Sequence, residues 1–110
     1  MIIDFEKIQQ DVIPHFKGGE GETKNRMFFD GTNKIMHGTL EPGCTIGYHN
    51  HETSSEIIYI LSGDARVLYD DGEEHLVPGQ CHYCPKGHSH SLINASPNTS
   101  LTYIAVVPEQ

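Results

Sequence analysis

Short runs of alternating apolar and polar residues, separated by glycine, proline and Asp-Gly pairs, constrain this chain more than any other feature. A period of two indicates strands with one buried face, and many short runs between turns are typical of an all-β sandwich or barrel. Asp30-Gly31 and Asp71-Gly72 predict hairpin turns, because these residues tolerate the positive φ of tight turns. Strands are predicted at Arg26–Phe29, Lys34–Leu40, Thr45–His49, Glu56–Leu61, Ala65–Tyr69, His75–Val77, Gln80–Cys84, His90–Ile93 and Leu101–Val107.

Helical periodicity is almost absent. Only Asp4–Gln10 is expected to form a helical turn, with Asp4 as its cap and Pro14 beyond its end. The polar, glycine-rich segment 17–25 predicts a mobile loop. A length of 110 residues fits one domain, so we expect a single domain over 1–110, with an N-terminal arm at 1–25 and a barrel at 26–110.

The charge balance narrows the classes of partner. Acidic residues outnumber basic ones 15 to 7, which gives a net charge of −8 and argues against nucleic acid or an anionic membrane. The three cysteines cannot all pair, so no disulfide framework is implied. The chain has no apolar run of membrane-spanning length and no basic leader at its N-terminus. We therefore expect a cytoplasmic protein that binds neither nucleic acid nor membrane.

Two clusters of histidine carry the chemistry of the sequence. His49 and His51 are two residues apart on a predicted strand, so both side chains point to one face, and Glu56 follows after a short loop. Imidazoles with one carboxylate suit a divalent metal such as Fe, Mn, Ni, Co or Zn. A lone surface histidine pair is more often not a ligand set, but a second cluster, from His82 to His90, changes that balance.

Both clusters lie inside longer motifs. Residues 43–63 read G-x5-H-x-H-x4-E-x6-G, and residues 79–94 read G-x5-P-x-G-x2-H-x3-N. These stretches resemble the two signature motifs of the cupin superfamily, and the chain is similar to its small single-domain (type 2) members. The resemblance implies a double-stranded β-helix, a jelly-roll-like barrel, with one metal per subunit. Gln80 departs from the aspartate that is frequent after the second motif's first glycine, at a position expected to serve a turn.

The resemblance also implies roles for individual residues. The four metal ligands carried over onto this sequence are His49, His51, Glu56 and His90. The motif glycines are expected to open or close turns, and Asn94 is expected to bond nearby backbone.

Residues beside the ligand set could tune the chemistry. His82 and Cys84 share one face of a predicted strand, which the resemblance places inside the barrel. His82 is our candidate for a general acid–base residue, and a hydrogen-bonded core histidine is the alternative. His88 is expected on an exposed loop and Tyr48 on the outer face. The cations near the barrel segments are taken to be Arg26, Arg66 and Lys86, and no basic clamp is evident.

Three functional classes remain open. The first is a metal-dependent enzyme that acts on a small polar molecule in the barrel, as an oxygenase, decarboxylase, isomerase or lyase. The second is a non-catalytic module that binds or senses a sugar or small acid, and the third is a structural barrel with an incidental metal. Four intact ligands that leave coordination positions open favour the enzyme.

Assembly is the last expectation. The segment Ile2–Phe16 has more apolar residues than one helical turn needs. Small cupins commonly pair, so we expect this segment to cover a sheet edge or to pack across the two-fold axis of a homodimer.

Overall fold

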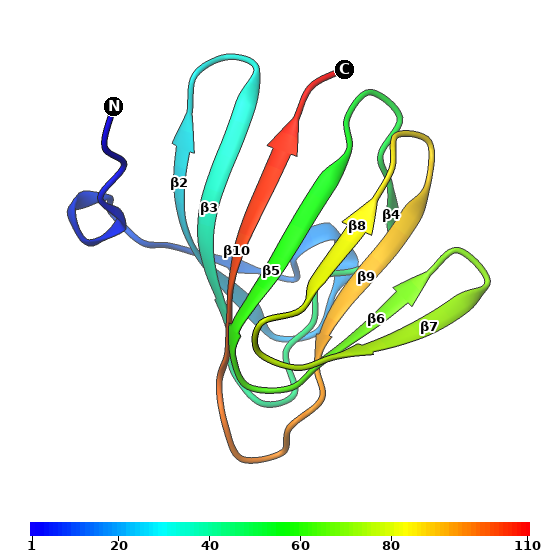
Figure 1. Ribbon diagram of the computed structural model, residues 1–110. Coiled ribbons are helices and arrows are strands. Elements are labelled where there is room, and N and C mark those ends of the chain that lie inside the picture. Colours follow the sequence, from blue (N-terminus) through cyan, green and yellow to red (C-terminus); the bar gives the residue numbers. More distant parts are fainter.

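The computed structural model describes all 110 residues, and strands dominate them. The predicted all-β class is confirmed (Figure 1). The elements are the 3₁₀ turns η1 (Phe5–Lys7) and η2 (Phe16–Gly18), and the strands β1 (Asp11–Pro14), β2 (Glu22–Phe29), β3 (Asn33–Leu40), β4 (His49–Asn50), β5 (Glu56–Ser62), β6 (Ala65–Tyr69), β7 (Gly72–Leu76), β8 (Cys81–Cys84), β9 (Ser89–Asn94) and β10 (Leu101–Pro108).

Two antiparallel sheets face each other to form the barrel. One has six strands in the order β1-β2-β3-β10-β5-β8, and the other has four in the order β4-β9-β6-β7. Strands distant in sequence lie side by side, as β10 does between β3 and β5 (Figure 1). No helix has the length and apolar character needed to cross a bilayer.

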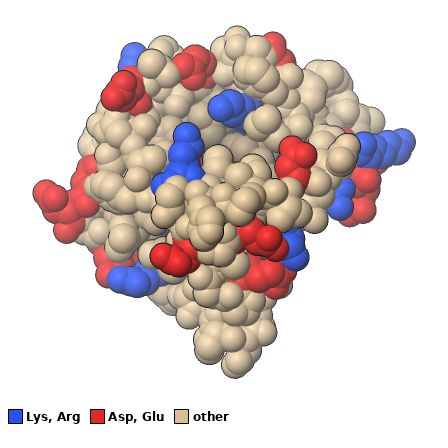
Figure 2. Space-filling model, turned by 180° about the vertical axis from the view of Figure 1, so that it is seen from behind, with Lys and Arg blue, Asp and Glu red and all other residues tan.

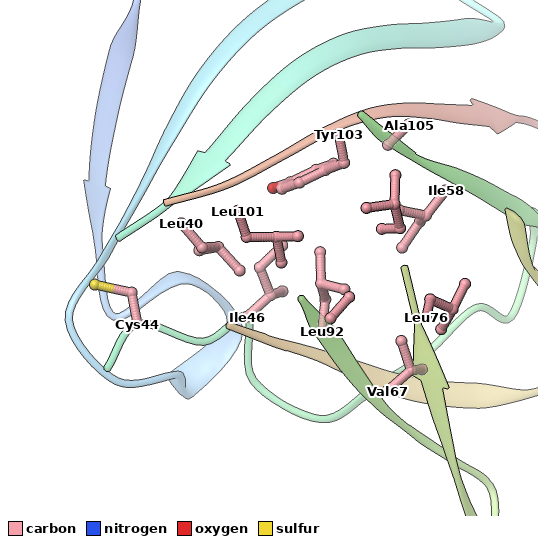
Figure 3. Close-up of a cluster of buried hydrophobic side chains, with 12 residues drawn as sticks. Leu40, Cys44, Ile46, Ile58, Val67, Leu76, Leu92, Leu101, Tyr103 and Ala105 are labelled. Carbon is pink, nitrogen blue, oxygen red and sulfur yellow. The ribbon is translucent and has the colours of Figure 1, made fainter. Parts of the chain in front are cut away.

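The core lies between the sheets at one end of the barrel. Alternate residues of β10 and β5 point inward, so Leu101, Tyr103 and Ala105 pack against Ile58 and Ile60. Figure 3 shows Leu101, Tyr103 and Ile58 converging with Leu92 and Val67 of the opposite sheet. Glu56 is the first residue of β5 and points inward like Ile58 and Ile60. The interior of the barrel is therefore apolar at one end and polar at the other.

Four details of the predicted elements were wrong. Segment 17–25 is not one loop, because η2 forms at Phe16–Gly18 and β2 already begins at Glu22. Asp11–Pro14 is an unforeseen strand that pairs with β2 as an edge, where proline is tolerated. The predicted strand Thr45–His49 is reduced to one bridge, Thr45–Ile93, and the two-residue β4. The second hairpin turns at Asp70-Asp71, because Tyr69 pairs with Gly72.

The N-terminal segment covers the edge of the larger sheet, as expected. Asp4 caps η1, since its carboxylate accepts from the amide of Glu6 at 3.1 Å, but the helix is a 3₁₀ turn of three residues. The Arg26 guanidinium donates to the carbonyl of Ile8 at 2.5 Å and fastens this segment to β2.

Candidate metal centre

Strand pairing brings the two histidine clusters together. His49 in β4 lies directly opposite His90 in β9, so their side chains are neighbours on one face. The Asn50 amide, on the other face, donates to Ser89 Oγ at 2.9 Å and to the Gly87 carbonyl at 3.0 Å, and so holds this short pairing in register. His51 follows β4, and Glu56 starts β5 in the facing sheet.

The four predicted ligands converge on one point, and we call them the His–Glu cluster: His49, His51, Glu56 and His90. His51 Nε2 lies 3.1 Å from His49 Nε2, 3.0 Å from Glu56 Oε1 and 2.9 Å from His90 Nε2. His90 Nε2 lies 2.9 Å from the same carboxylate oxygen. The structure thus brings together the residues that the motifs singled out; that they hold a metal stays a prediction.

The outer nitrogen of each imidazole is already engaged. His49 Nδ1 donates to the Gly47 carbonyl at 2.7 Å, because a carbonyl can only accept. His51 Nδ1 lies 2.9 Å from Ser54 Oγ. A neutral ring that donates through Nδ1 presents a lone pair at Nε2, so lone pairs and a carboxylate face one another across about 3 Å. Such a donor set favours a cation, and the residues fit a borderline divalent metal.

The pKa shifts in the cluster favour the protonation states that bind a metal, an ionised Glu56 and a neutral His49. Burial alone would raise the pKa of Glu56, but the adjacent His51 and His90 side chains lower it to about 2, so the carboxylate is ionised. Burial lowers the pKa of His49, which favours the neutral, metal-binding imidazole.

His82 lies behind the cluster rather than in it. It is 1% exposed, as the strand parity predicted, and its Nε2 is 3.0 Å from His90 Nδ1. Its Nδ1 is 2.7 Å from a carboxylate oxygen of Glu74 in β7. Because the carboxylate accepts, His82 donates through Nδ1 and accepts at Nε2, and His90 Nδ1 must then donate to it. The chain Glu74–His82–His90 fixes the tautomer in which His90 Nε2 points its lone pair at the cluster.

Sequence reasoning missed Glu74. It is one of several acids in an exposed hairpin, and only its side-chain contact with His82 gives it a role. Cys84 also lies near His82 and His90. Burial raises the pKa of its thiol to about 11, so the thiol is protonated in the protein without a metal. Cys81 points outward and Cys84 inward, so the two cannot form a redox pair.

A cavity of about 610 Å³ opens beside the cluster and is lined by all four of its residues. Lys17 and Lys34 line it as well, so the expectation that only Arg26, Arg66 and Lys86 are cations near the barrel was wrong. Glu52 and Glu109 line the same cavity, so its charge is mixed. Figure 2 shows the rear face of the molecule, where positively charged side chains border a hollow. His82 does not line the cavity.

The remaining predicted positions lie outside the site. His88 Nδ1 bonds Asp70 Oδ2 at 2.6 Å on the surface, and Tyr48 is 53% exposed. The motif glycines Gly43, Gly63, Gly79 and Gly87 all have positive φ, as turns of this kind require. Asn94 donates to the carbonyls of Leu40 and Thr99, so its predicted structural role is confirmed.

Comparisons with known proteins agree with this architecture. Residues 36–107 match the model of a family described as "Cupin domain". An oxalate-binding protein of Thermotoga maritima is 32% identical over an alignment of 118 positions, which covers 97% of this chain and 93% of that protein.

Solved structures give the same result. A predicted oxalate decarboxylase of Thermotoga maritima superposes with a TM-score of 0.92 at 27% identity over the whole of both chains. The Cnp3 cupin domain of Schizosaccharomyces pombe has a TM-score of 0.80 at 10% identity, covers 100% of this chain and 70% of its own, and shows the fold alone. The double-stranded β-helix implied by the motifs is thereby confirmed.

Proposed function

The chain belongs to the cupin family, and from this premise we propose that it is a metal-dependent enzyme acting on a small carboxylate in the barrel. The observation that carries the proposal is the His–Glu cluster, whose donor atoms converge beside the cavity with their outer nitrogens engaged. The names of the two Thermotoga maritima proteins support a carboxylate, with oxalate as the first compound to test.

The cluster would hold one divalent transition metal, from among Fe, Mn, Ni, Co and Zn. When bound, such an ion supplies a Lewis acid that polarises a carboxylate or carbonyl oxygen. The chain's own residues hold the ligand set in one tautomer, form the cavity wall around the substrate and keep Glu56 ionised. Decarboxylation fits a carboxylate substrate best among the four reaction types considered.

A non-catalytic binding module is the second candidate, and the name of the curated relative favours it. The test begins with metal analysis of protein purified without oxygen, followed by calorimetric titration with oxalate and assays of carbon dioxide release and oxygen consumption. Turnover supports the enzyme, and saturable binding without turnover supports the module. A chain that retains no metal and binds no carboxylate would refute both.

We further propose that His82 is a positioning residue that acts through His90. Replacing His82 with leucine removes the acceptor for His90 Nδ1, so we expect the metal affinity to fall roughly 10- to 100-fold. Cobalt-loaded protein should show a changed visible spectrum, which a merely structural role would not produce. Glu74→Gln is the matched variant: its amide oxygen can still accept from His82, so a smaller loss is expected. Equal affinity in all three proteins would contradict the role.

We also propose a homodimer formed through the outer face of the larger sheet. The outward positions of β5, β8 and β10 carry no charged residue: Ile57, Tyr59, Leu61, Cys81, Tyr83, Thr102, Ile104 and Val106. Ile57 lies opposite both Tyr83 and Val106, so the apolar surface is continuous. Ile57, Tyr59, Leu61 and Tyr83 on this face are each between 39% and 54% exposed. A second copy of the chain would cover this uncharged surface in a two-fold dimer.

The dimer is tested with Ile57→Glu, which places a charge at the centre of this face. Light scattering should give a dimer mass for the wild type and a monomer mass for the variant. Val77→Glu, at an exposed apolar residue outside this face, should remain dimeric. A monomeric wild type at micromolar concentration would refute the interface.

A further inference from the structure

The cavity carries polar groups at its core end that the His–Glu cluster does not use. Asn25 in β2, Gly38 in β3 and Tyr103 in β10 are direct partners across the larger sheet, so all three face the interior. A Cβ at Gly38 would overlap the Tyr103 ring, so the absence of one allows the phenol to lie across β3 toward Asn25. Figure 3 shows the Tyr103 hydroxyl turned along the sheet, away from Ala105.

These groups have no partner within the protein. Tyr103 is only 3% exposed and Asn25 is half-buried, and the polar atoms of both side chains make no hydrogen bond to the chain and open on the cavity. Both residues line the cavity. Thr23, the preceding inward residue of β2, also lines it and has a buried hydroxyl without a partner. Polar groups that the chain leaves unpaired on a cavity wall bond either water or a ligand, so Tyr103 and Asn25 are available to a polar group of a bound molecule.

The space between the two ends is apolar. Ala105 is the next inward residue after Tyr103 on β10, and the strand pairings place Met27, Met36 and Ile58 in the same row across the sheet. These three side chains line the cavity. Tyr103 is opposite Ile60, four residues along β5 from Glu56, which is about 13 Å of strand. A cavity of about 610 Å³ is in the range for ligands much larger than oxalate, the smallest dicarboxylate.

We propose that Asn25 and Tyr103 form a distal subsite for an uncharged hydroxyl or carbonyl group of an elongated substrate. This inference rests on the proposed function, because the carboxylate end of the same molecule would lie at the His–Glu cluster. The substrate class is then a chelating acid with an apolar middle and a neutral polar tail, spanning on the order of 10 Å. Oxalate would occupy only the metal end.

The neutral tail follows from the chemistry of the subsite. An amide and a phenol can each donate and accept, and neither carries charge to pair with an ionised tail. Burial raises the pKa of Tyr103, so its hydroxyl remains a neutral donor. An ionised group placed there would lose its hydration without compensation.

The test uses protein loaded with Zn²⁺, which has no redox chemistry of its own. Calorimetry compares oxalate with 2-oxo acids of increasing chain length, each with and without a terminal hydroxyl. At the length that spans the cavity, the hydroxyl should tighten binding roughly 3- to 10-fold. Tyr103→Phe should remove this preference and Asn25→Ala should weaken it, while oxalate binds all proteins equally. Tyr59→Phe, on the outer face, is the matched control and should keep it.

The possible failures are separable. If oxalate binds but no chain length shows a hydroxyl preference, or if Tyr103→Phe retains the preference, the distal subsite is refuted and the metal site stands. If neither oxalate nor any 2-oxo acid binds the loaded protein, the proposed function fails and the subsite fails with it. Melting temperatures of both variants near that of the wild type confirm that the comparison is between folded proteins.

Discussion

Replacing His51 with alanine is expected to lower the metal affinity roughly 100-fold or more. His51 Nε2 is the hub of the cluster, within 3.1 Å of a donor atom of each of its three neighbours. Four-ligand zinc sites bind with about 10–16 kcal/mol, so one ligand accounts for about 3 kcal/mol, or about two orders of magnitude. Competition with a chromophoric chelator measures the change.

Thermal stability gives an independent measurement. An ion that binds only the folded state stabilises it, by about 2.7 kcal/mol at 100 times the dissociation constant. The wild type should therefore melt higher when loaded, while His51→Ala at the same metal concentration should gain only about 0.4 kcal/mol, a much smaller rise in melting temperature. The apolar core lies at the other end of the barrel, so both stripped proteins should stay folded.

His75→Ala is the matched control, because the His75 side chain is 63% exposed and lies outside the cluster. It should bind metal like the wild type. Unchanged affinity in His51→Ala would show that the cluster is not the metal site. Complete unfolding of the stripped wild type would show instead that the ion is structural.

Strand parity explains why the site could be predicted from sequence. Residues two apart on a strand share a face, so the inward positions of His82 and Cys84 followed without any knowledge of the pairing. His49 and His51 also meet as predicted, although β4 ends at Asn50 and His51 lies just beyond it. The pairing of His49 with His90 could not be obtained this way, because it depends on which strands become neighbours. The motif spacing supplied that information through the resemblance.

Residues whose roles depend on tertiary contacts were missed. Glu74 bonds His82 because β7 and β8 approach each other at the barrel wall, and nothing in its own neighbourhood distinguishes it from Glu73. The segment 43–49 has the composition of a strand, but its backbone bonds to η2: the amide of Gly47 donates to the Phe16 carbonyl at 3.0 Å. A contact between residues this far apart leaves no periodic signal.

Replacing Gly47 with alanine is expected to damage both the fold and the metal site. A Cβ at this position would overlap the carbonyl oxygen of Lys17 and lie 2.8 Å from the amide nitrogen of Gly19. Both atoms belong to the backbone, so no side chain can turn aside, and the η2 segment must move. Overpacking of this kind costs about 1–3 kcal/mol, and the loss of the bond to Phe16 adds to it.

The same change should weaken metal binding, because the Gly47 carbonyl accepts from His49 Nδ1 at 2.7 Å and so orients that ligand. Loss of an orienting partner typically lowers metal affinity about 10- to 100-fold. Urea denaturation and chelator competition measure the two effects on one preparation. Gly72→Ala is the matched control, since its nearest contact would be an ordinary 3.6 Å to the Tyr69 carbonyl. If Gly47→Ala matched that control in both measurements, the close backbone approach that positions His49 would be wrong.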